Sequence, residues 1–143
     1  MLIKNIMTRD VEVVRPDSGL QEAASKMKSL NIGSLPVCDG NKIHGMITDR
    51  DIAIRAVAEG LDMAQTKVAD VMTDDLIYCF DDQPVSEAAG VMQRHQIRRL
   101  PIVNRSKELV GIISLGDLAV DTENTNLAGA TLEDISQPAM PAR

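Results

Sequence analysis

Apolar residues recur at helical spacing in two stretches of the chain, and each stretch follows a turn signal. The first stretch has them at Leu20, Ala23, Ala24, Met27 and Leu30, and the second has them at Val85, Ala88, Ala89 and Met92. Spacing of three and four residues places such side chains on one stripe of a helix. The turn and cap signals are residues 16–19 (Pro-Asp-Ser-Gly) and 81–84 (Asp-Asp-Gln-Pro). The pattern therefore predicts two amphipathic helices.

Short apolar runs bounded by turn residues predict β-strands around these helices. They cover residues 11–14, 35–38 and 43–48 in the first half of the chain, and 76–80, 100–103 and 109–114 in the second. Hairpin turns are predicted at residues 39–42 and 104–107. A further helix is predicted from about 49 to 59, where Gly60 suits its C-terminal cap, and a short one from 115 to 120.

The two halves of this pattern are copies of each other. Sliding the chain by 65 residues gives eleven identities in the 34 positions from 4 to 37, among them Leu35-Pro36 on Leu100-Pro101. After one inserted residue, the segment 45–51 falls on 111–117. With ordinary residue usage, chance matching at one fixed offset would give roughly one identity in every fifteen or twenty positions. The chain therefore contains an internal duplication.

Each copy has the order β-α-β-β-α, which predicts a mixed α+β fold. A unit of about 60 residues buries too small a share of its surface to be stable alone, so we expect the two copies to pack through their sheets. The predicted organisation is repeat one over 1–60, a connector over 61–67, repeat two over 68–120 and a C-terminal tail over 121–143. The tail is rich in Thr, Asn, Ala and Pro, with at most one weak helical turn at 132–135.

Composition narrows the class of protein. The chain has 143 residues with 15 Lys+Arg and 21 Asp+Glu, a net charge of −6, and it has one Tyr, one Phe and no Trp. Its core must therefore be aliphatic, and the chain lacks the basic surface and stacking platforms of nucleic-acid-binding proteins. No apolar run approaches the ~18 residues of a membrane helix, and the N-terminus does not resemble a signal peptide. Two cysteines are too few for a disulfide framework, so we expect a cytoplasmic protein.

The duplicated segments 45–51 and 111–117, at the end of the last strand of each copy, contain the candidate ligand-binding residues. Each segment places a hydroxyl and a carboxylate three residues apart at a helix start: Thr48 with Asp51, and Ser114 with Asp117. The unpaired N–H groups of such a start attract anions, the hydroxyl can donate to phosphate, and the carboxylate can accept from ribose hydroxyls. The alternative is that these residues only cap the helix. The segment contains no nucleophile–base pair and no metal cage, so it is not catalytic.

The span from about residue 4 to 120 resembles a tandem pair of cystathionine β-synthase (CBS) domains, a Bateman module. The resemblance rests on residues 32–37 followed by 45–51, and on residues 97–102 followed by 111–117. It implies two pseudo-twofold related repeats with clefts between them that bind adenosine derivatives. It also implies a flat homodimer, since two such modules commonly stack.

The resemblance also implies roles for individual residues. Thr48 and Ser114 would lie near phosphate, and Asp51 and Asp117 would hold the ribose. Backbone at two further segments, Gly33-Ser34 and Arg98-Arg99, would frame adenine or phosphate.

The two copies differ beside this segment. Repeat two has Arg98 and Arg99 where repeat one has Gly33 and Ser34, and the guanidinium fork suits phosphate oxygens. We therefore expect the Ser114/Asp117 site to be the stronger phosphate site, although either arginine could be a solvated rim charge. Arg50 could assist the other site, or form an ion pair at the helix start with its acidic neighbours.

The sequence thus predicts a non-enzymatic regulatory protein. It has no obligatory cofactor, binds AMP, ADP or ATP, and signals through dimer geometry or a protein partner, with no nucleic-acid or membrane partner. One alternative is a structural or stress-response protein that needs no ligand. Another is a metal- or redox-responsive module that uses Cys38, His44 and Cys79. For these three residues, two small buried thiols and a turn histidine are the simpler interpretation.

Overall fold

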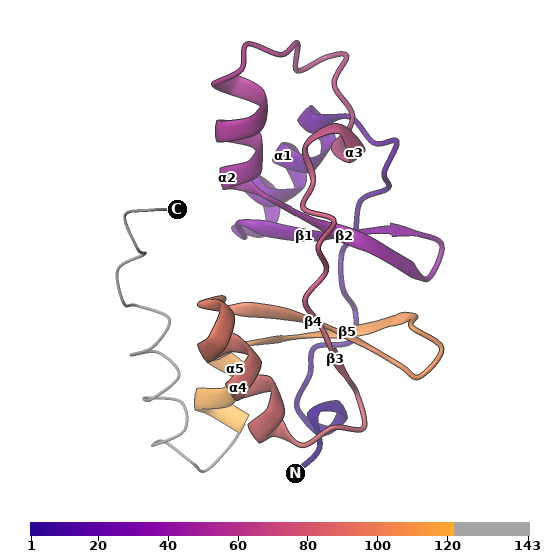
Figure 1. Cartoon of the computed structure of the whole chain (residues 1–143), viewed down its shortest axis with the longest axis vertical. Helices are drawn as coiled ribbons and strands as arrows, with labels where there is room; N and C mark the ends of the chain where they lie inside the picture. The colour runs from indigo at the N-terminus through magenta and orange to yellow at the C-terminus, as the bar shows by residue number, and fades with distance from the viewer. Residues whose placement is uncertain (122–143) are drawn as a thin grey trace. The chain divides into compact units, whose positions relative to one another are not determined.

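The apolar runs form two small β-sheets in the computed structural model, which describes residues 1–121 (Figure 1). In the first sheet, β1 (Ser34–Asp39) pairs antiparallel with β2 (Lys42–Thr48). The second sheet has the order β3-β4-β5, and it contains β3 (Cys79–Phe80), β4 (Arg99–Val103) and β5 (Leu109–Ser114). Its first two strands run parallel. The mixed α+β class expected from the sequence is confirmed.

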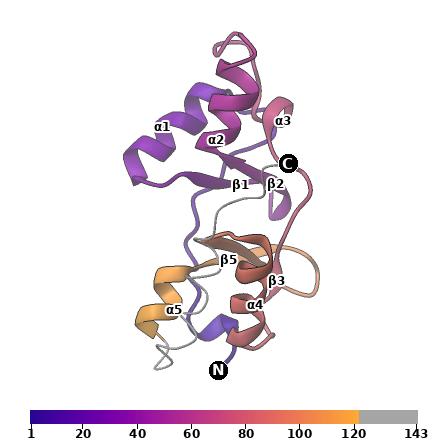
Figure 2. The same cartoon turned by 60° about the vertical axis from the view of Figure 1, so that its left-hand side comes forward.

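The two amphipathic helices form where the apolar stripe predicts them. They are α1 (Leu20–Leu30) and α4 (Val85–His95), and each ends at a residue in the left-handed region, Asn31 and Gln96, both with φ of 53°. Within their own units, α1 and α2 cover one face of the first sheet, and α4 and α5 cover one face of the second (Figures 1 and 2). The shorter helices are η1 (Ile3–Asn5), α2 (Asp49–Asp51), the π-helix η2 (Ile52–Val57), α3 (Val68–Val71) and α5 (Leu115–Asp121).

The helix predicted over 49–59 thus forms as α2 followed by η2. Gly60 follows with a φ of +71°, the left-handed conformation expected of a residue after a helix end. The predicted tail, with its helical turn at 132–135, lies outside the described residues except for its first residue, which ends α5.

The chain divides into two compact units that do not follow the sequence repeats. Unit N comprises Glu12–Leu76 with Lys107–Leu109, and unit C comprises Met1–Val11, Ile77–Ser106 and, among the described residues, 110–121. The first segment of each repeat therefore belongs to the unit that holds the rest of the other repeat.

Backbone hydrogen bonds show how these exchanged segments are held. In unit C, Thr8 and Ile112 exchange N–H···O bonds of 2.8 and 2.9 Å. In unit N, Thr73 and Met46 exchange bonds of 2.8 and 2.9 Å in the same way. Each exchanged segment thus adds one bridge residue to the last strand of its unit.

The strand predicted over 11–14 is wrong except for its last residue. Only Val14 pairs, through a parallel bridge to Val37 of β1. The carbonyl of Val13 accepts instead from Lys26 Nζ at 2.7 Å, and the N–H of Arg15 donates to Ser18 Oγ at 3.0 Å. Because the neighbouring backbone groups are bonded to side chains, the ladder cannot extend.

The strand predicted over 76–80 is likewise reduced to its last two residues. Cys79 and Phe80 pair with Ile102 and Val103. The N–H of Phe80 donates to Gln83 Oε1 at 2.7 Å, which begins the turn into α4.

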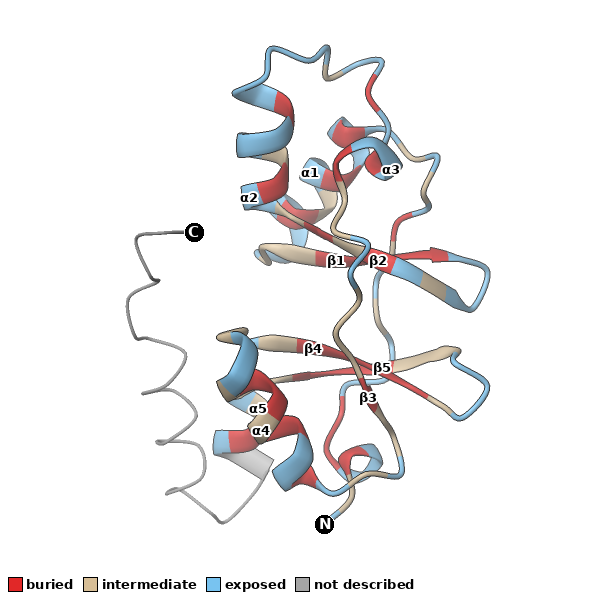
Figure 3. Cartoon of the chain, viewed as in Figure 1, coloured by how far each residue is buried: buried red, intermediate tan, exposed pale blue. Residues whose placement is uncertain are grey.

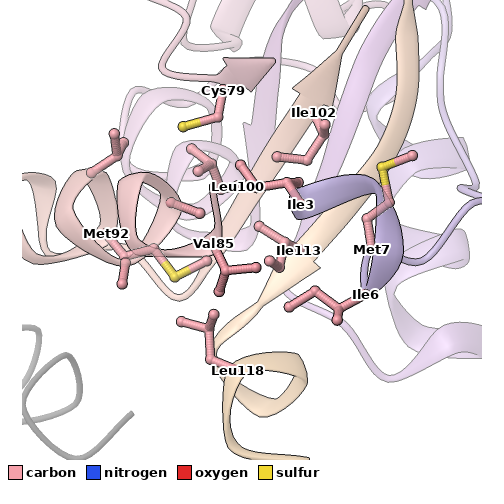
Figure 4. Close-up of a cluster of buried hydrophobic side chains, with 13 residues drawn as sticks. Ile3, Ile6, Met7, Cys79, Val85, Met92, Leu100, Ile102, Ile113 and Leu118 are labelled. Atoms are coloured by element: carbon pink, nitrogen blue, oxygen red, sulfur yellow. The ribbon is translucent and has the colours of Figure 1, made fainter. Parts of the chain in front are cut away.

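Each unit has its own aliphatic core (Figure 3). Figure 4 shows the core of unit C, where side chains from η1, the sheet, α4 and α5 meet: Ile3, Ile6, Met7, Cys79, Val85, Ala88, Ala89, Val91, Met92, Leu100, Ile102, Ile113 and Leu118. The core of unit N contains Val14, Leu20, Ala23, Met27, Leu35, Val37, Ile47, Ala56, Val68 and Val71. No aromatic residue belongs to either cluster, so the aliphatic core inferred from composition is confirmed for residues 1–121.

The two apolar stripes are not equally buried. On α4, all four stripe residues are buried, whereas on α1 Ala24 and Leu30 are exposed. The sequence pattern overestimated the width of the buried face of α1, because the same spacing occurs in both copies.

Candidate functional site

The Thr48–Asp51 junction lies where β2 ends and α2 begins. Asp51 N–H donates to Thr48 Oγ1 at 3.0 Å, and Thr48 N–H donates to Asp51 Oδ2 at 3.0 Å. This reciprocal pair is a capping box, which satisfies two N–H groups that the helix start would leave unpaired. The hydroxyl and the carboxylate are thus brought together as the sequence predicts.

The Ser114–Asp117 junction repeats this arrangement between β5 and α5. Asp117 N–H donates to Ser114 Oγ at 3.1 Å, and Ser114 N–H donates to Asp117 Oδ2 at 2.8 Å. Both junctions therefore perform the capping role that was the alternative interpretation of these residues. Capping uses one carboxylate oxygen in each case, so it does not by itself consume the groups a ligand would need.

The surroundings of Asp51 differ from those of Asp117. Thr73 Oγ1 lies 3.3 Å from each carboxylate oxygen of Asp51, and Arg55 Nε lies 3.7 Å from Oδ1. Asp51 is only 8% exposed. Asp117 is half-buried, and within residues 1–121 its carboxylate accepts a hydrogen bond from Ser114 N–H.

Sequence reasoning missed Arg55 and Thr73. The spacing of Asp51 and Arg55 by four residues is a signal for a helical ion pair that could have been noticed. Thr73 is brought to Asp51 only by the exchanged segment, and nothing local in the sequence indicates that contact.

The two predicted arginines occupy different environments. Leu115 N–H donates to the carbonyl of Arg98 at 2.9 Å, so the Arg98-Arg99 step lies against the start of α5. Arg98 is exposed, while Arg99 is half-buried at the start of β4. The Nε of Arg99 is buried and has no hydrogen-bond partner among the described residues. An unsatisfied buried N–H of a charged group is unfavourable, so an oxygen of a ligand at the Nε of Arg99 would be stabilising.

At the junction of unit N, an acidic side chain lies beside the position that corresponds to Arg98. Asp49 N–H donates to the carbonyl of Gly33 at 2.9 Å, and a Cβ on Gly33 would lie 3.0 Å from Asp49 Oδ2. Ser34 is paired in register with Thr48, so its backbone lies beside the junction. Arg50 is exposed, and its backbone N–H donates to Asp49 Oδ1 at 2.8 Å.

The cysteines are buried free thiols. Burial raises the pKa of Cys38 and of Cys79 to about 11, which favours the protonated thiol over the thiolate that binds metals. His44 is exposed on β2. Among residues 1–121, no group of three or more His, Cys, Asp or Glu side chains could hold a metal ion. None of the helices in that range has the length and apolar character needed to cross a membrane.

Comparisons with known proteins agree with the duplication. The family model described as "CBS domain" matches residues 3–57 and 68–120. The chain is 46% identical over 134 residues to the CBS domain-containing protein YhcV of Bacillus subtilis, and the match covers 94% of each protein.

Two solved structures are similar along most of the chain. Hypoxic Response Protein I, solved with two coordinated zinc ions, is 35% identical with a TM-score of 0.78, and the match covers 85% of this chain and 99% of that one. The CBS domain pair of protein MJ0100, solved with 5′-methylthioadenosine and S-adenosyl-L-methionine, is 29% identical with a TM-score of 0.71. That match covers 83% of this chain and 93% of that one.

Proposed function

The chain belongs to the CBS domain family, and from that premise we propose that it is a non-catalytic regulatory protein that binds an adenine nucleotide. The proposed site is the Ser114–Asp117 junction of unit C, with AMP, ADP or ATP as the ligand. Occupancy would be transmitted through a homodimer or a protein partner. The non-catalytic class is supported by the match to YhcV, a protein named for its CBS domain, because that match covers 94% of each chain.

The observation that carries the proposal is the unpartnered Nε of Arg99 beside the junction. A phosphate oxygen would satisfy this N–H with a charge-assisted hydrogen bond, which is stronger than a neutral one. Ser114 Oγ accepts from a backbone N–H, so its own proton remains available for a second phosphate oxygen. The proposed phosphate donors are therefore the Ser114 hydroxyl and the Arg99 guanidinium, and the backbone of the neighbouring Arg98 contacts the start of α5.

The Asp117 carboxylate is the group proposed to hold the sugar. Two vicinal ribose hydroxyls need two acceptor positions, and a carboxylate has about four lone-pair sites, of which Asp117 uses one for Ser114 N–H. The ligands of the MJ0100 pair are adenosine derivatives, which supports adenosine as the shared part. With only Tyr78 and Phe80 as aromatic residues, adenine would pack between aliphatic side chains rather than on a ring.

Isothermal titration calorimetry and thermal unfolding with AMP, ADP and ATP test this proposal. We expect at least one of the three to raise the melting temperature, since a ligand of the folded state stabilises it. Asp117→Asn should weaken that ligand at least tenfold, and Arg99→Gln should weaken AMP more than adenosine. The matched control is Arg98→Gln, which removes an exposed guanidinium at the neighbouring position.

The ligand-independent alternative makes the opposite prediction. If the junction is only a cap, Asp117→Asn lowers the melting temperature of the free protein and changes no affinity. A flat thermal response to all three nucleotides at millimolar concentration contradicts the proposed function.

A further inference from the structure

The carboxylate of Asp51 is engaged from within its own unit. We infer that Arg55 and Thr73 close the Thr48–Asp51 junction, so that the chain binds one adenine nucleotide and not two. This inference rests on the proposed function for the ligand class, and it adds the number of sites and the side chains that set that number.

Both carboxylate oxygens of Asp51 have partners within unit N. Oδ2 accepts from Thr48 N–H at 3.0 Å, Thr73 Oγ1 lies 3.3 Å from both oxygens, and Arg55 Nε lies 3.7 Å from Oδ1. At 8% exposure the carboxylate has little access to solvent. A ribose diol would have to displace the threonine hydroxyl and the guanidinium to reach it.

Arg55 is held by a second set of contacts. Its Nη1 lies 3.3 Å from the carbonyl of Val71 and 3.2 Å from that of Met72, at the end of α3. Carbonyls at a helix end have no partner within the helix, so the guanidinium satisfies two groups that would otherwise depend on water. Moving Arg55 away from Asp51 therefore also breaks the contact between η2 and α3.

The duplicated position in unit C lacks this closure. The residue that corresponds to Arg55 is Asp121, and the residue that corresponds to Thr73 is Thr8. Thr8 is exposed, and no hydrogen bond from its hydroxyl to Asp117 occurs among residues 1–121. No cation at this helical spacing can therefore pair with Asp117.

The charges beside the two junctions point the same way. Asp49 lies against Gly33 in unit N, where its carboxylate would repel a phosphate group. The corresponding residues of unit C are Leu115 and Arg98. A phosphorylated ligand therefore meets the carboxylate of Asp49 at one junction, whereas at the other the equivalent position carries the uncharged Leu115.

Native mass spectrometry and calorimetry with AMP and with adenosine test the inference on the full chain. We expect one AMP per chain for the wild type, lost with Asp117→Asn and retained with Asp51→Asn. The double variant Arg55→Gln/Thr73→Val should bind a second adenosine per chain, because it frees the Asp51 carboxylate and leaves the Thr48 cap intact. Lys28→Gln is the control, since it removes an exposed positive charge of unit N from the last turn of α1 and belongs to neither junction, and it should still bind one ligand.

Each other outcome overturns the inference or separates it from the proposed function. Two AMP molecules on the wild type overturn the inference and leave the proposed function standing, as does loss of the single ligand with Asp51→Asn. If the wild type binds no nucleotide, the proposed function fails. The double variant then tests the closure of the Thr48–Asp51 junction by itself. Binding of an adenosine to that variant supports the closure, and no binding overturns it. Circular dichroism of each variant establishes that it is folded.

Discussion

The strand–helix junctions of the two units have the same backbone geometry and different side-chain environments. In both, a hydroxyl and a carboxylate three residues apart form a reciprocal cap with bonds of 2.8–3.1 Å. Around Asp51 a threonine and an arginine fill the remaining acceptor positions, whereas Arg99 beside the other junction has an unpaired Nε. A duplication thus preserves the cap, which local sequence determines, while the neighbouring charges diverge.

A second pair of regions shows the same divergence. In unit C, Arg105 binds Asp82 through two hydrogen bonds of 2.8 and 2.9 Å, and its guanidinium carbon lies 4.1 Å from the centroid of the Phe80 ring. In unit N, Arg15 occupies the position of Phe80 and contacts Asp17 at 3.1 Å and Asp39 at 3.4 Å. In both units an ion pair connects the hairpin turn to the segment before the amphipathic helix, α4 or α1. The hairpin turn supplies the arginine in unit C (Arg105), whereas the segment before the helix supplies it in unit N (Arg15).

The largest effect on the free energy of unfolding is expected at the two glycines that the exchanged segments pass, Gly45 beside Thr73 and Gly111 beside Thr8. A Cβ on Gly45 would overlap the carbonyl of Thr73, and one on Gly111 would lie 2.8 Å from the carbonyl of Thr8 and 2.7 Å from Met7 Sδ. Gly45→Ala should therefore cost roughly 1–3 kcal/mol or more in the free energy of unfolding, since overpacking forces the backbone to shift.

Gly111→Ala should cost less than Gly45→Ala, because one of its obstacles is the end of a flexible methionine. Gly19→Ala is the control, since a Cβ there meets nothing within 4 Å. Urea unfolding ranks the three variants by their free energy of unfolding. Equal stability of Gly45→Ala and Gly19→Ala would refute the close contact between Gly45 and the carbonyl of Thr73.

The next largest effect compares the burial of the two amphipathic helices, α1 and α4. Ala24 and Ala89 are equivalent in the duplication, but Ala24 is exposed and Ala89 is 0% exposed. Ala89→Leu should lower the free energy of unfolding by roughly 1–3 kcal/mol, because Ala89 is fully buried in the core of unit C and overpacking a core is destabilising. Ala24→Leu should stay within about 0.5 kcal/mol of the wild type, as surface substitutions do. Similar melting temperatures for the two variants would show that the buried faces of α1 and α4 do not differ.

The smallest effect concerns the ion pair between Arg105 and Asp82. The hydrogen bond from Arg105 lowers the pKa of Asp82, so the pair stabilises the folded state above the ordinary pKa of an aspartate, and this contribution is lost as pH falls through the lowered value. The difference in melting temperature between the wild type and Asp82→Asn should therefore shrink below about pH 4. Arg105→Lys should remove part of the difference at neutral pH, because lysine lacks the two-pronged geometry. A difference that is independent of pH would rule out this contribution.

Much of the fold and of the junctions follows from the sequence alone. Periodicity placed α1 and α4, and the hairpin turns placed β1, β2, β4 and β5, because these patterns depend on contacts between near neighbours. The pairs Thr48–Asp51 and Ser114–Asp117 were predicted for the same reason, since a cap spans only three residues. The strand over 11–14 was predicted wrongly because Lys26, thirteen residues beyond Val13, takes the carbonyl that a ladder would use.

The sequence by itself thus determined the duplication, the aliphatic core and the hydroxyl–carboxylate pair in each copy. Only the tertiary structure decided which segment completes each unit, that α4 buries its whole apolar stripe while α1 does not, and that Thr73 and Arg55 reach the carboxylate of Asp51. The physical reason is range: a cap or a helical stripe is set by neighbours in the chain. A contact between residues 51 and 73 depends instead on how distant segments pack, and a repeat copies the former more faithfully than the latter.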